Sequence, residues 1–221
     1  MQQGLLPLGY TQSYELFDFV VDNCNQMAFE LFHAALQGAT KDKFICIYGE
    51  PGCGKTHLFQ GLAKNYNLAY NTANQALTTN LWDLVYGEQQ VLILDDAHKV
   101  DDDVWWFHLY NLVKEQNKLL VIGATKPPSM WPVTLADWRS RLATFISVEM
   151  HSPDDETLKR VLEKIWKDKG IVVDNSILEY LARRIDRNFP AICQWAEKID
   201  MLSAQQRRPI TVSMLHHLFS A

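Results

Sequence analysis

The sequence predicts an α/β fold in which a parallel five-stranded sheet is flanked by helices and followed by a small all-helical domain. Up to about residue 150, short apolar runs alternate with segments of helical periodicity, which is the pattern of a parallel sheet covered on both faces. After Ser152-Pro153 only amphipathic helical patterns occur. We therefore expect an N-terminal tail over residues 1–12, a base domain over 13–150 and a helical lid domain over 151–221.

The elements follow one another in a regular order. The first helix is expected over residues 23–38, because Met27, Leu31 and Ala35 recur at helical spacing and Gly38 is a typical stop. Buried strands are expected at residues 44–48, 68–71, 91–94, 119–124 and 144–148. Helices are expected between and after them at residues 57–64, 104–115, 154–169, 174–186, 190–203 and 211–219.

Composition excludes several classes of protein. With 48% hydrophobic and 21% charged residues among 221, the chain has the content of a packed globular protein rather than a disordered one. The net charge of -5 argues against a protein that coats nucleic acid with its whole surface. No apolar run reaches the ~20 residues of a membrane span, and residues 1–10 lack the features of a signal peptide. The four cysteines form no CxxC pair, so we expect reduced thiols and a cytoplasmic protein without a membrane partner.

The strongest local signal lies between the first expected strand and the helix after it. Residues 49–56, GEPGCGKT, fit the P-loop pattern GxxxxGK[ST] in full and in the required context. Glycines allow the backbone N–H groups to curl around phosphates, and the following helix adds the positive end of its dipole. Lys55 is expected to reach the β and γ phosphates of ADP or ATP, and Thr56 to bind Mg²⁺. The expected cofactor-binding residues here are Gly49, Pro51, Gly52, Cys53, Gly54, Lys55, Thr56 and His57.

Polar residues at the ends of two further strands complete this site. Asp95 follows the apolar run VLIL and is expected to hold Mg²⁺, while Asp96 is placed to orient the attacking water as a general base. The plainer interpretation is two aspartates that cap a loop. Thr125 ends the next strand, where its hydroxyl would contact the γ phosphate or the water; a solvated strand end is the alternative. Because Asp96 is shorter than the glutamate of many ATPases, we expect nucleotide binding but only weak intrinsic hydrolysis.

Arg141 lies just before the fifth expected strand. In an oligomeric ATPase, an arginine at this place points toward the nucleotide of a neighbouring subunit and stabilises the charge of phosphoryl transfer. Spacing alone favours the plainer interpretation, a surface or helix-capping arginine.

Together these motifs resemble the DnaA family of AAA+ ATPases over nearly the whole chain. The resemblance rests on residues 14–21 with Asn25, on 49–58, 91–98 and 107–111, on the Lys126-Pro127-Pro128 turn and on 140–142. It implies an AAA+ fold, an adenine contact by Phe19, Val20 and Asn25, and a catalytic role in trans for Arg141. The family usually has a sensor arginine in the lid, but Pro190 falls on its place, so a contact with the γ phosphate would have to come from Arg187. Thr125 also stands where initiators usually have aspartate.

The family's initiators carry a further DNA-reading domain beyond their lid, whereas this sequence ends with the helical bundle. What it contains resembles the family's regulators of the initiator. Such regulators dock on the replicative sliding clamp through a QxxLPL segment, and residues 3–8, QGLLPL, match it. The residues expected to bind the clamp are Gln3, Leu5, Leu6, Pro7 and Leu8. Read without the resemblance, this segment is a tail with scattered apolar residues.

The resemblance implies a negative regulator of replication initiation. Bound to nucleotide, with ADP expected in the resting form, it would be recruited by the DNA-loaded clamp and would stimulate hydrolysis of ATP held by the DnaA initiator. DNA would be contacted only indirectly, and self-pairing into a homodimer or larger assembly stays open. The alternative is an ATP-hydrolysing loader or remodelling ATPase that acts on a helicase or transposition complex at DNA. Pro190, Thr125 and the acidic balance count against that alternative.

Overall fold

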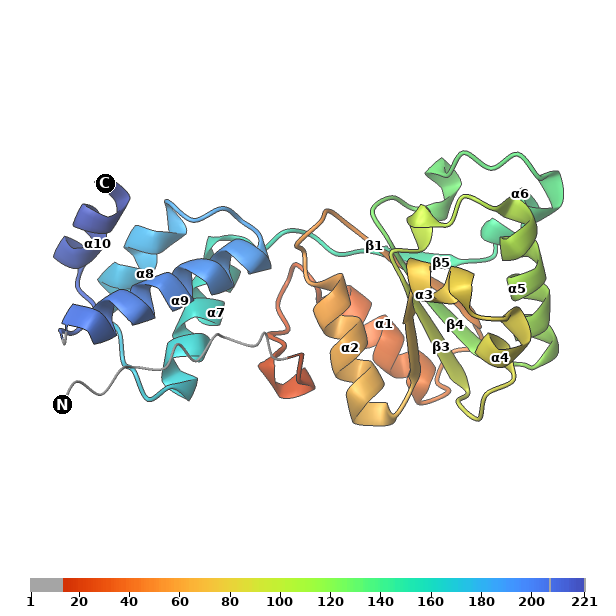
Figure 1. The fold of residues 1–221 in the computed structure, drawn as a ribbon, viewed down its shortest axis with the longest axis horizontal. Helices are drawn as coiled ribbons and strands as arrows, with labels where there is room; N and C mark the ends of the chain where they lie inside the picture. Colours follow the sequence, from red (N-terminus) through yellow and green to blue (C-terminus); the bar gives the residue numbers. More distant parts are fainter. Residues whose placement is uncertain (1–13, 207, 221) are drawn as a thin grey trace.

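A computed structural model describes residues 14–206 and 208–220 (Figure 1). Its centre is one sheet of five strands in the order β2-β3-β4-β1-β5, and all paired strands run parallel. The strands are β1 (Phe44–Tyr48), β2 (Ala69–Thr72), β3 (Val91–Asp95), β4 (Leu119–Ala124) and β5 (Ile146–Glu149). Every residue of β3 and β4 is buried, as expected for central strands that are covered on both faces. The expected fold class is confirmed.

Helices cover both faces of the sheet (Figure 1). One face packs against α1 (Gln26–Leu36) and α2 (Lys55–Tyr66). The other packs against four helices: α3 (Ala73–Thr78), α4 (Leu81–Val85), α5 (Asp103–Glu115) and α6 (Ala136–Leu142). Single turns of 3₁₀ helix occur at η1 (Leu16–Asp18), η2 (Ala97–Lys99) and η3 (Pro128–Met130). We call the elements from η1 to β5 the base.

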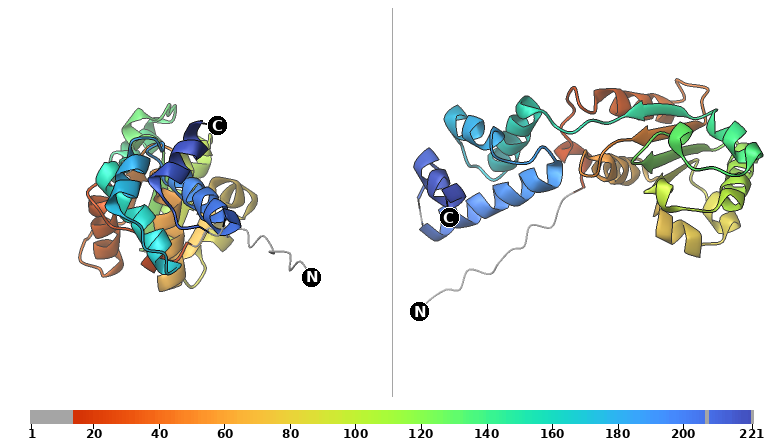
Figure 2. Two further views of the ribbon diagram at one scale, coloured as in Figure 1. Left: turned by 90° about the vertical axis from the view of Figure 1, so that its left-hand side faces the viewer. Right: turned by 90° about the horizontal axis from the view of Figure 1, so that it is seen from above.

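The C-terminal helices form a separate bundle, which we call the lid. It consists of α7 (Asp155–Asp168), α8 (Asn175–Ala182), α9 (Phe189–Gln206) and α10 (Val212–Ser220). Asp154 caps α7, accepting the backbone N–H of Thr157 at 2.7 Å. A core that includes the fully buried Trp166 holds the bundle together, and Figure 2 shows the lid beside the base rather than folded over the sheet.

The structure differs from the sequence-based prediction at short elements and at element ends. The helices α3, α4 and α6 were not expected, because five to seven residues are too few for a periodic pattern to stand out. The fifth strand was expected at residues 144–148 but begins at Ile146, since the N–H and hydroxyl of Thr144 both donate to the carbonyl of Arg141 and end α6. The helix expected over 174–186 ends at Ala182.

Within the described ranges, none of the helices combines the length and the apolar character that a membrane span requires.

Candidate nucleotide site

The P-loop connects β1 to α2 and depends on its glycines. Gly54 has a φ of 101°, a conformation that L side chains rarely adopt, immediately before the first residue of α2. A Cβ at Gly49 would lie 2.1 Å from the carbonyl oxygen of Met150, so the chain leaving β5 passes directly against the loop. These constraints hold the loop backbone at the N-terminal end of α2, where its N–H groups and the helix dipole favour an anion.

Lys55 lies inside this loop and is 8% exposed. Its ammonium donates to the carbonyl oxygens of Gly49 at 2.7 Å and Glu50 at 3.1 Å. It also lies 3.5 Å from the Sγ of Cys53, and burial raises the pKa of that thiol, which therefore stays neutral. A buried ammonium held by two neutral carbonyls can exchange these acceptors for phosphate oxygens, which bind it more strongly because they are charged.

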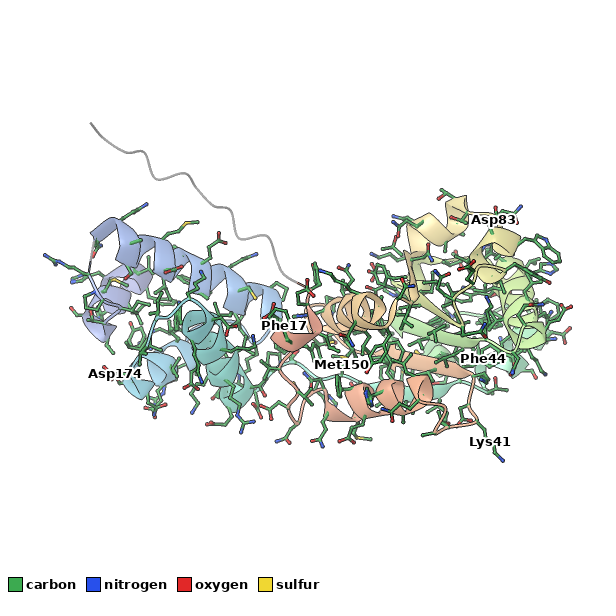
Figure 3. All side chains as sticks on the ribbon, turned by 90° about the horizontal axis from the view of Figure 1, so that it is seen from below. Phe17, Lys41, Phe44, Asp83, Met150 and Asp174 are labelled. Atoms are coloured by element: carbon green, nitrogen blue, oxygen red, sulfur yellow. The ribbon has the colours of Figure 1, made fainter. Side chains whose placement is uncertain are left out.

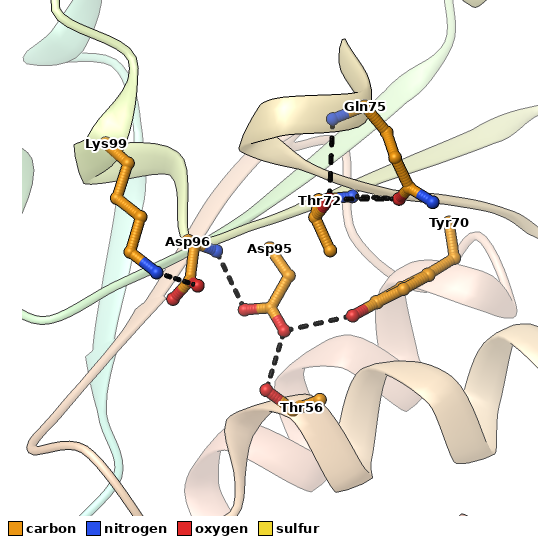
Figure 4. Close-up of polar contacts among 7 residues, drawn as sticks. All are labelled: Thr56, Tyr70, Thr72, Gln75, Asp95, Asp96 and Lys99. Carbon is orange, nitrogen blue, oxygen red and sulfur yellow. Dashed lines mark hydrogen bonds and ion pairs between the residues drawn. The ribbon is translucent and has the colours of Figure 1, made fainter.

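Thr56 and Asp95 form the second part of the site (Figure 4). The hydroxyl of Thr56 donates to Asp95 Oδ2 at 2.7 Å, and the hydroxyl of Tyr70 donates to the same oxygen at 3.2 Å. The other oxygen, Oδ1, accepts the backbone N–H of Asp96 at 2.9 Å. Burial raises the pKa of Tyr70 to about 12, so its phenol remains a donor at neutral pH. A hydroxyl and a carboxylate oxygen in contact are ligands that suit Mg²⁺, which usually takes one or two protein oxygens together with phosphate and water.

Asp96 and Thr125 lie at the same edge of the sheet but make different contacts. Asp96 has a φ of 56°, and its carboxylate forms an ion pair with Lys99 one turn further on, as Figure 4 shows. Its side chain is 42% exposed. Thr125 directly follows β4 and is half-buried. As the structure places it, the carboxylate proposed as a base lies at the surface beside a neighbouring lysine. In the described part of the chain, no group of three or more His, Cys, Asp or Glu side chains offers a separate metal site.

One residue that sequence reasoning missed is Gly123 in β4. A Cβ there would lie 2.4 Å from the ring of Phe59 and 2.7 Å from Asp95 Oδ1. Its only sequence signal is a glycine inside an apolar strand, which marks a close approach. Gly123→Ala is expected to destabilise the protein by about 1–3 kcal/mol through overpacking and to shift Asp95. Urea denaturation with and without Mg²⁺-nucleotide checks both effects; the control is Gly87→Ala, where φ is likewise outside the left-handed region and the nearest atom to a new Cβ, at 3.2 Å, is the end of the flexible Gln89 side chain. Equal losses in both variants would contradict the prediction.

The residues expected on the adenine side come together beside α2. The ring of His57 lies edge-on to Phe19 at 5.4 Å and to Tyr14 at 5.7 Å between centroids. Burial lowers the pKa of His57, so the imidazole is neutral at pH 7. Asn25 is 1% exposed and holds the preceding turn, since its amide nitrogen donates to the carbonyl of Val20 at 2.9 Å. This arrangement presents aromatic and neutral groups next to the P-loop, where a nucleotide base would lie.

The lid reaches the site through the first turn of α9. The backbone N–H of Phe189 donates to the carbonyl of Gly52 at 3.0 Å, and a Cβ on Gly54 would be 3.3 Å from the Phe189 ring. Pro190 lies against Gly52 from the same turn. Arg187, which was expected to reach toward phosphate, instead forms an ion pair with Asp155 at 2.9 Å. In the structure, the lid thus contacts the P-loop by backbone and ring atoms and by the side chain of Asn188, and Arg187 is paired within the lid.

The contacts of Arg141 are with residues outside the candidate nucleotide site. It lies on α6, which is fixed to α5 by the buried stack of Trp138 on Trp106, with 5.5 Å between ring centroids. The guanidinium of Arg141 lies 4.1 Å from the ring centroid of Phe107 and 5.4 Å from that of Tyr110, both on α5. Such stacking holds a cation in place while leaving its edge free for a second partner. The clamp-binding residues expected at positions 3–8 lie outside the described residues.

Comparison with known proteins places this geometry in context. A family model described as RNA helicase matches residues 45–128, from β1 to the turn after β4. An uncharacterised protein of Haemophilus influenzae is 28% identical over 81% of this chain and 83% of its own length. The chromosomal replication initiator protein DnaA of Symbiobacterium thermophilum is 29% identical over 85% of this chain and 46% of its own length. The chain therefore spans about half the length of the DnaA proteins it matches.

Solved structures show the same relationship at the level of the fold. Domain III of the Thermotoga maritima replication initiation protein DnaA superposes with a TM-score of 0.76 at 20% identity, covering 90% of this chain and 92% of that domain. The AMPPCP-bound DnaA of Aquifex aeolicus superposes with a TM-score of 0.70 at 24% identity, covering 85% of this chain and 65% of that one.

A parallel sheet with a P-loop after β1, a strand-end aspartate bonded to the P-loop threonine and a helical lid define an AAA+ protein. The curated relatives include many DnaA proteins, whereas the structural neighbours include both DnaA and the RuvB Holliday junction branch migration motor of Thermotoga maritima, which superposes with a TM-score of 0.71 at 16% identity. The chain carries a DnaA-like AAA+ domain.

Proposed function

We propose that this protein is a negative regulator of replication initiation, of the kind represented by Hda in the DnaA family. In its nucleotide-bound form it docks on the DNA-loaded sliding clamp and pairs its AAA+ face with that of the DnaA initiator. Arg141 then completes the initiator's ATP site and stimulates hydrolysis, which leaves the initiator bound to ADP. DNA is contacted through the clamp and the initiator.

The observation that carries this proposal is the contrast between Arg141 and the protein's own site. Arg141 is held on α5 by Phe107 and remains partly exposed, so it is available to another molecule. The protein's own Asp96 is paired with Lys99, and Arg187 with Asp155. Groups that would support rapid hydrolysis in cis are thus engaged elsewhere, whereas the group that acts in trans is presented.

The nucleotide we propose for the resting form is ADP with Mg²⁺. The P-loop, Lys55 and the contact between Thr56 and Asp95 supply an anion site and oxygen ligands for such a ligand. Two DnaA structures among the structural neighbours were solved with AMPPCP, an analogue of ATP. We assign this binding to residues 13–150, with residues 151–221 as the lid. In this role the nucleotide sets the shape of the protein, and weak turnover of its own ATP suffices.

The test is phosphate release from ATP-bound DnaA in the presence of this protein, with and without DNA-loaded clamp. Strong release that requires the loaded clamp is expected. Release from the purified protein alone, stimulated by DNA and independent of the initiator, would instead favour the alternative of a loader or remodelling ATPase. The alternative also predicts that Asp95→Ala abolishes that turnover.

Recruitment by the clamp gives a separate prediction. Replacing Leu6 and Leu8 by alanine is expected to remove clamp-dependent stimulation, because truncating apolar anchors in a short docking segment typically costs at least about 2 kcal/mol of binding. Binding of the variant to immobilised clamp measures this loss, and unchanged ADP affinity serves as the control for folding. Wild-type clamp binding by the double variant would remove the docking role from residues 3–8.

A further inference from the structure

The segment from Tyr14 to Asn25, at the start of the base, lies at the boundary with the lid and packs on the cores of both. Phe19 packs into the base core with α1 and α2, where its ring is stacked on Phe29 at 6.1 Å. Its neighbour Val20 packs instead against the core of the lid. In Figure 3 the labels of Phe17 and Met150 mark this junction, midway between the two parts. The same segment carries the aromatic contact with His57, so it borders the nucleotide site as well.

Asp22 is the charged centre of the junction. Its side chain is 8% exposed, and a carboxylate buried to this degree needs several donors. One oxygen, Oδ1, accepts the N–H of Asn23 at 2.9 Å. The other accepts the hydroxyl of Thr157 and the guanidinium of Arg160, both at 3.1 Å and both from α7 of the lid. A second bridge from α7 lies nearby, where Lys164 donates to Asp18 at 2.8 Å.

The position of Asp22 is tied in turn to the nucleotide side of the segment. The backbone N–H of Asp22 donates to Asn25 Oδ1 at 2.9 Å, while the amide nitrogen of the same Asn25 holds the carbonyl of Val20. A shift of the lid that moves Asp22 therefore moves the turn that carries Phe19 and Val20. Because Asn25 and Thr157 are 1% and 0% exposed, this chain of contacts is enclosed by packed atoms and has little freedom to absorb such a shift.

The other contact of the lid with the site is made by the start of α9 and by Asn188, whose side chain lies against Gly52. In the first turn of α9, the N–H of Phe189 donates to Gly52 and the N–H of Ala191 to Asn188 Oδ1, and Pro190 has no N–H. Arg187 is paired with Asp155. The lid is thus linked to the site through the junction segment and through a backbone contact with the P-loop.

We propose that Asp22 is a positioning residue of the nucleotide site, which couples binding of the nucleoside half of the ligand to the orientation of the lid through Thr157 and Arg160. The inference rests on the proposed nucleotide binding. It implies that ADP and ATP order the lid to the same extent, since the junction segment borders the nucleoside half of the ligand, which both share.

The experiment compares Thr157→Val, which removes the hydroxyl donor but keeps the shape, with Thr157→Ser, which keeps the donor. Affinities for ADP and for AMPPCP are measured by calorimetry. The distance between lid and base is measured by pulsed electron resonance with spin labels at Lys41 and Val172, in a Cys193→Ser background; the other cysteines are buried. Arg160→Glu tests the same contact from a side chain that is 60% exposed, and its urea midpoint is measured alongside to separate loss of the contact from loss of stability. Its matched control is Arg183→Glu at the C-terminal end of α8.

In the wild type, ADP and AMPPCP are expected to narrow the distribution of distances between the labels at Lys41 and Val172 to the same extent. Thr157→Val and Arg160→Glu should each lower the affinities for ADP and AMPPCP by the same factor, about 5- to 50-fold for a coupling of this kind. Each should also abolish the narrowing of the distance distribution. Thr157→Ser and Arg183→Glu should behave as the wild type.

Wild-type affinity and narrowing in both Thr157→Val and Arg160→Glu would overturn the inference, as would narrowing by AMPPCP but not by ADP. If the wild type bound neither nucleotide, the proposed nucleotide site itself would fail, and the coupling with it. If the wild type bound both nucleotides but the distance between lid and base did not respond, the coupling would be overturned and the nucleotide site would stand.

Discussion

Replacement of Arg141 by alanine is expected to reduce stimulated hydrolysis of initiator-bound ATP by about 10³- to 10⁵-fold, the range found for arginines that act in trans on phosphoryl transfer. The physical reason is that the guanidinium stabilises charge that develops on the transferring phosphate, where water has been excluded. Single-turnover hydrolysis by ATP-bound DnaA, with this protein and DNA-loaded clamp in excess, measures the effect. Clamp binding and ADP affinity of the variant should be unchanged, because Arg141 contacts Phe107 and Tyr110 rather than the P-loop.

Two further variants make this test specific. Arg141→Lys keeps the positive charge but loses the planar fork and much of the stacking on Phe107, so it should recover only a small part of the activity. Arg139→Ala removes an exposed arginine from the same helix, where it donates to the carbonyl of Val133, and should retain stimulation. The mechanism is wrong if Arg141→Ala stimulates hydrolysis as well as the wild type does.

Lys55→Ala is expected to lose most of the affinity for ADP. The variant removes a buried cation from the site of the phosphates, a change that typically costs about 2–5 kcal/mol, or at least roughly 30-fold in the dissociation constant. Thermal unfolding checks this result, because ligand at 100 times its dissociation constant stabilises the native state by about 2.7 kcal/mol. At that ADP concentration a site weakened roughly 30-fold gains only about 0.9 kcal/mol, so ADP should raise the Tm of Lys55→Ala by at most about a third of the rise in the wild type.

The control for Lys55→Ala is Lys114→Ala, an exposed lysine in the last turn of α5. It removes the same charge from the protein without touching the P-loop, and ADP should still raise its Tm. An ADP-dependent rise of equal size in Lys55→Ala would show that the phosphates are bound elsewhere.

Much of the candidate nucleotide site can be predicted from motifs in the sequence. The pattern GxxxxGK[ST] between a buried strand and a helix is typical of a P-loop. Residues 49–56 by themselves therefore predict the P-loop that the structure contains. The apolar runs at residues 44–48, 91–94 and 119–124 predict central strands because they are hydrophobic on both faces, and only a covered parallel sheet buries both. Periodicity over fourteen residues likewise predicts α7, where Leu158, Val161, Leu162 and Trp166 are buried on one face.

Contacts between distant residues could not be predicted in this way. Nothing in the sequence around Arg187 indicates that it pairs with Asp155, or that Asp22 receives two of its donors from α7 across 135 and 138 positions of chain. The short helix α6 also lacks a periodic signal; it forms because Trp138 is buried against Trp106, and that packing decides where Arg141 lies.

The sequence alone therefore determined the class of fold and the motifs of the candidate nucleotide site, because backbone geometry and hydrophobic periodicity are local properties. The tertiary structure decided which charges are engaged, which are presented and how the lid is joined to the base. The pairing of each charged group depends on which residues the fold brings within hydrogen-bonding distance of it. A buried charge is stable only where such a partner is present.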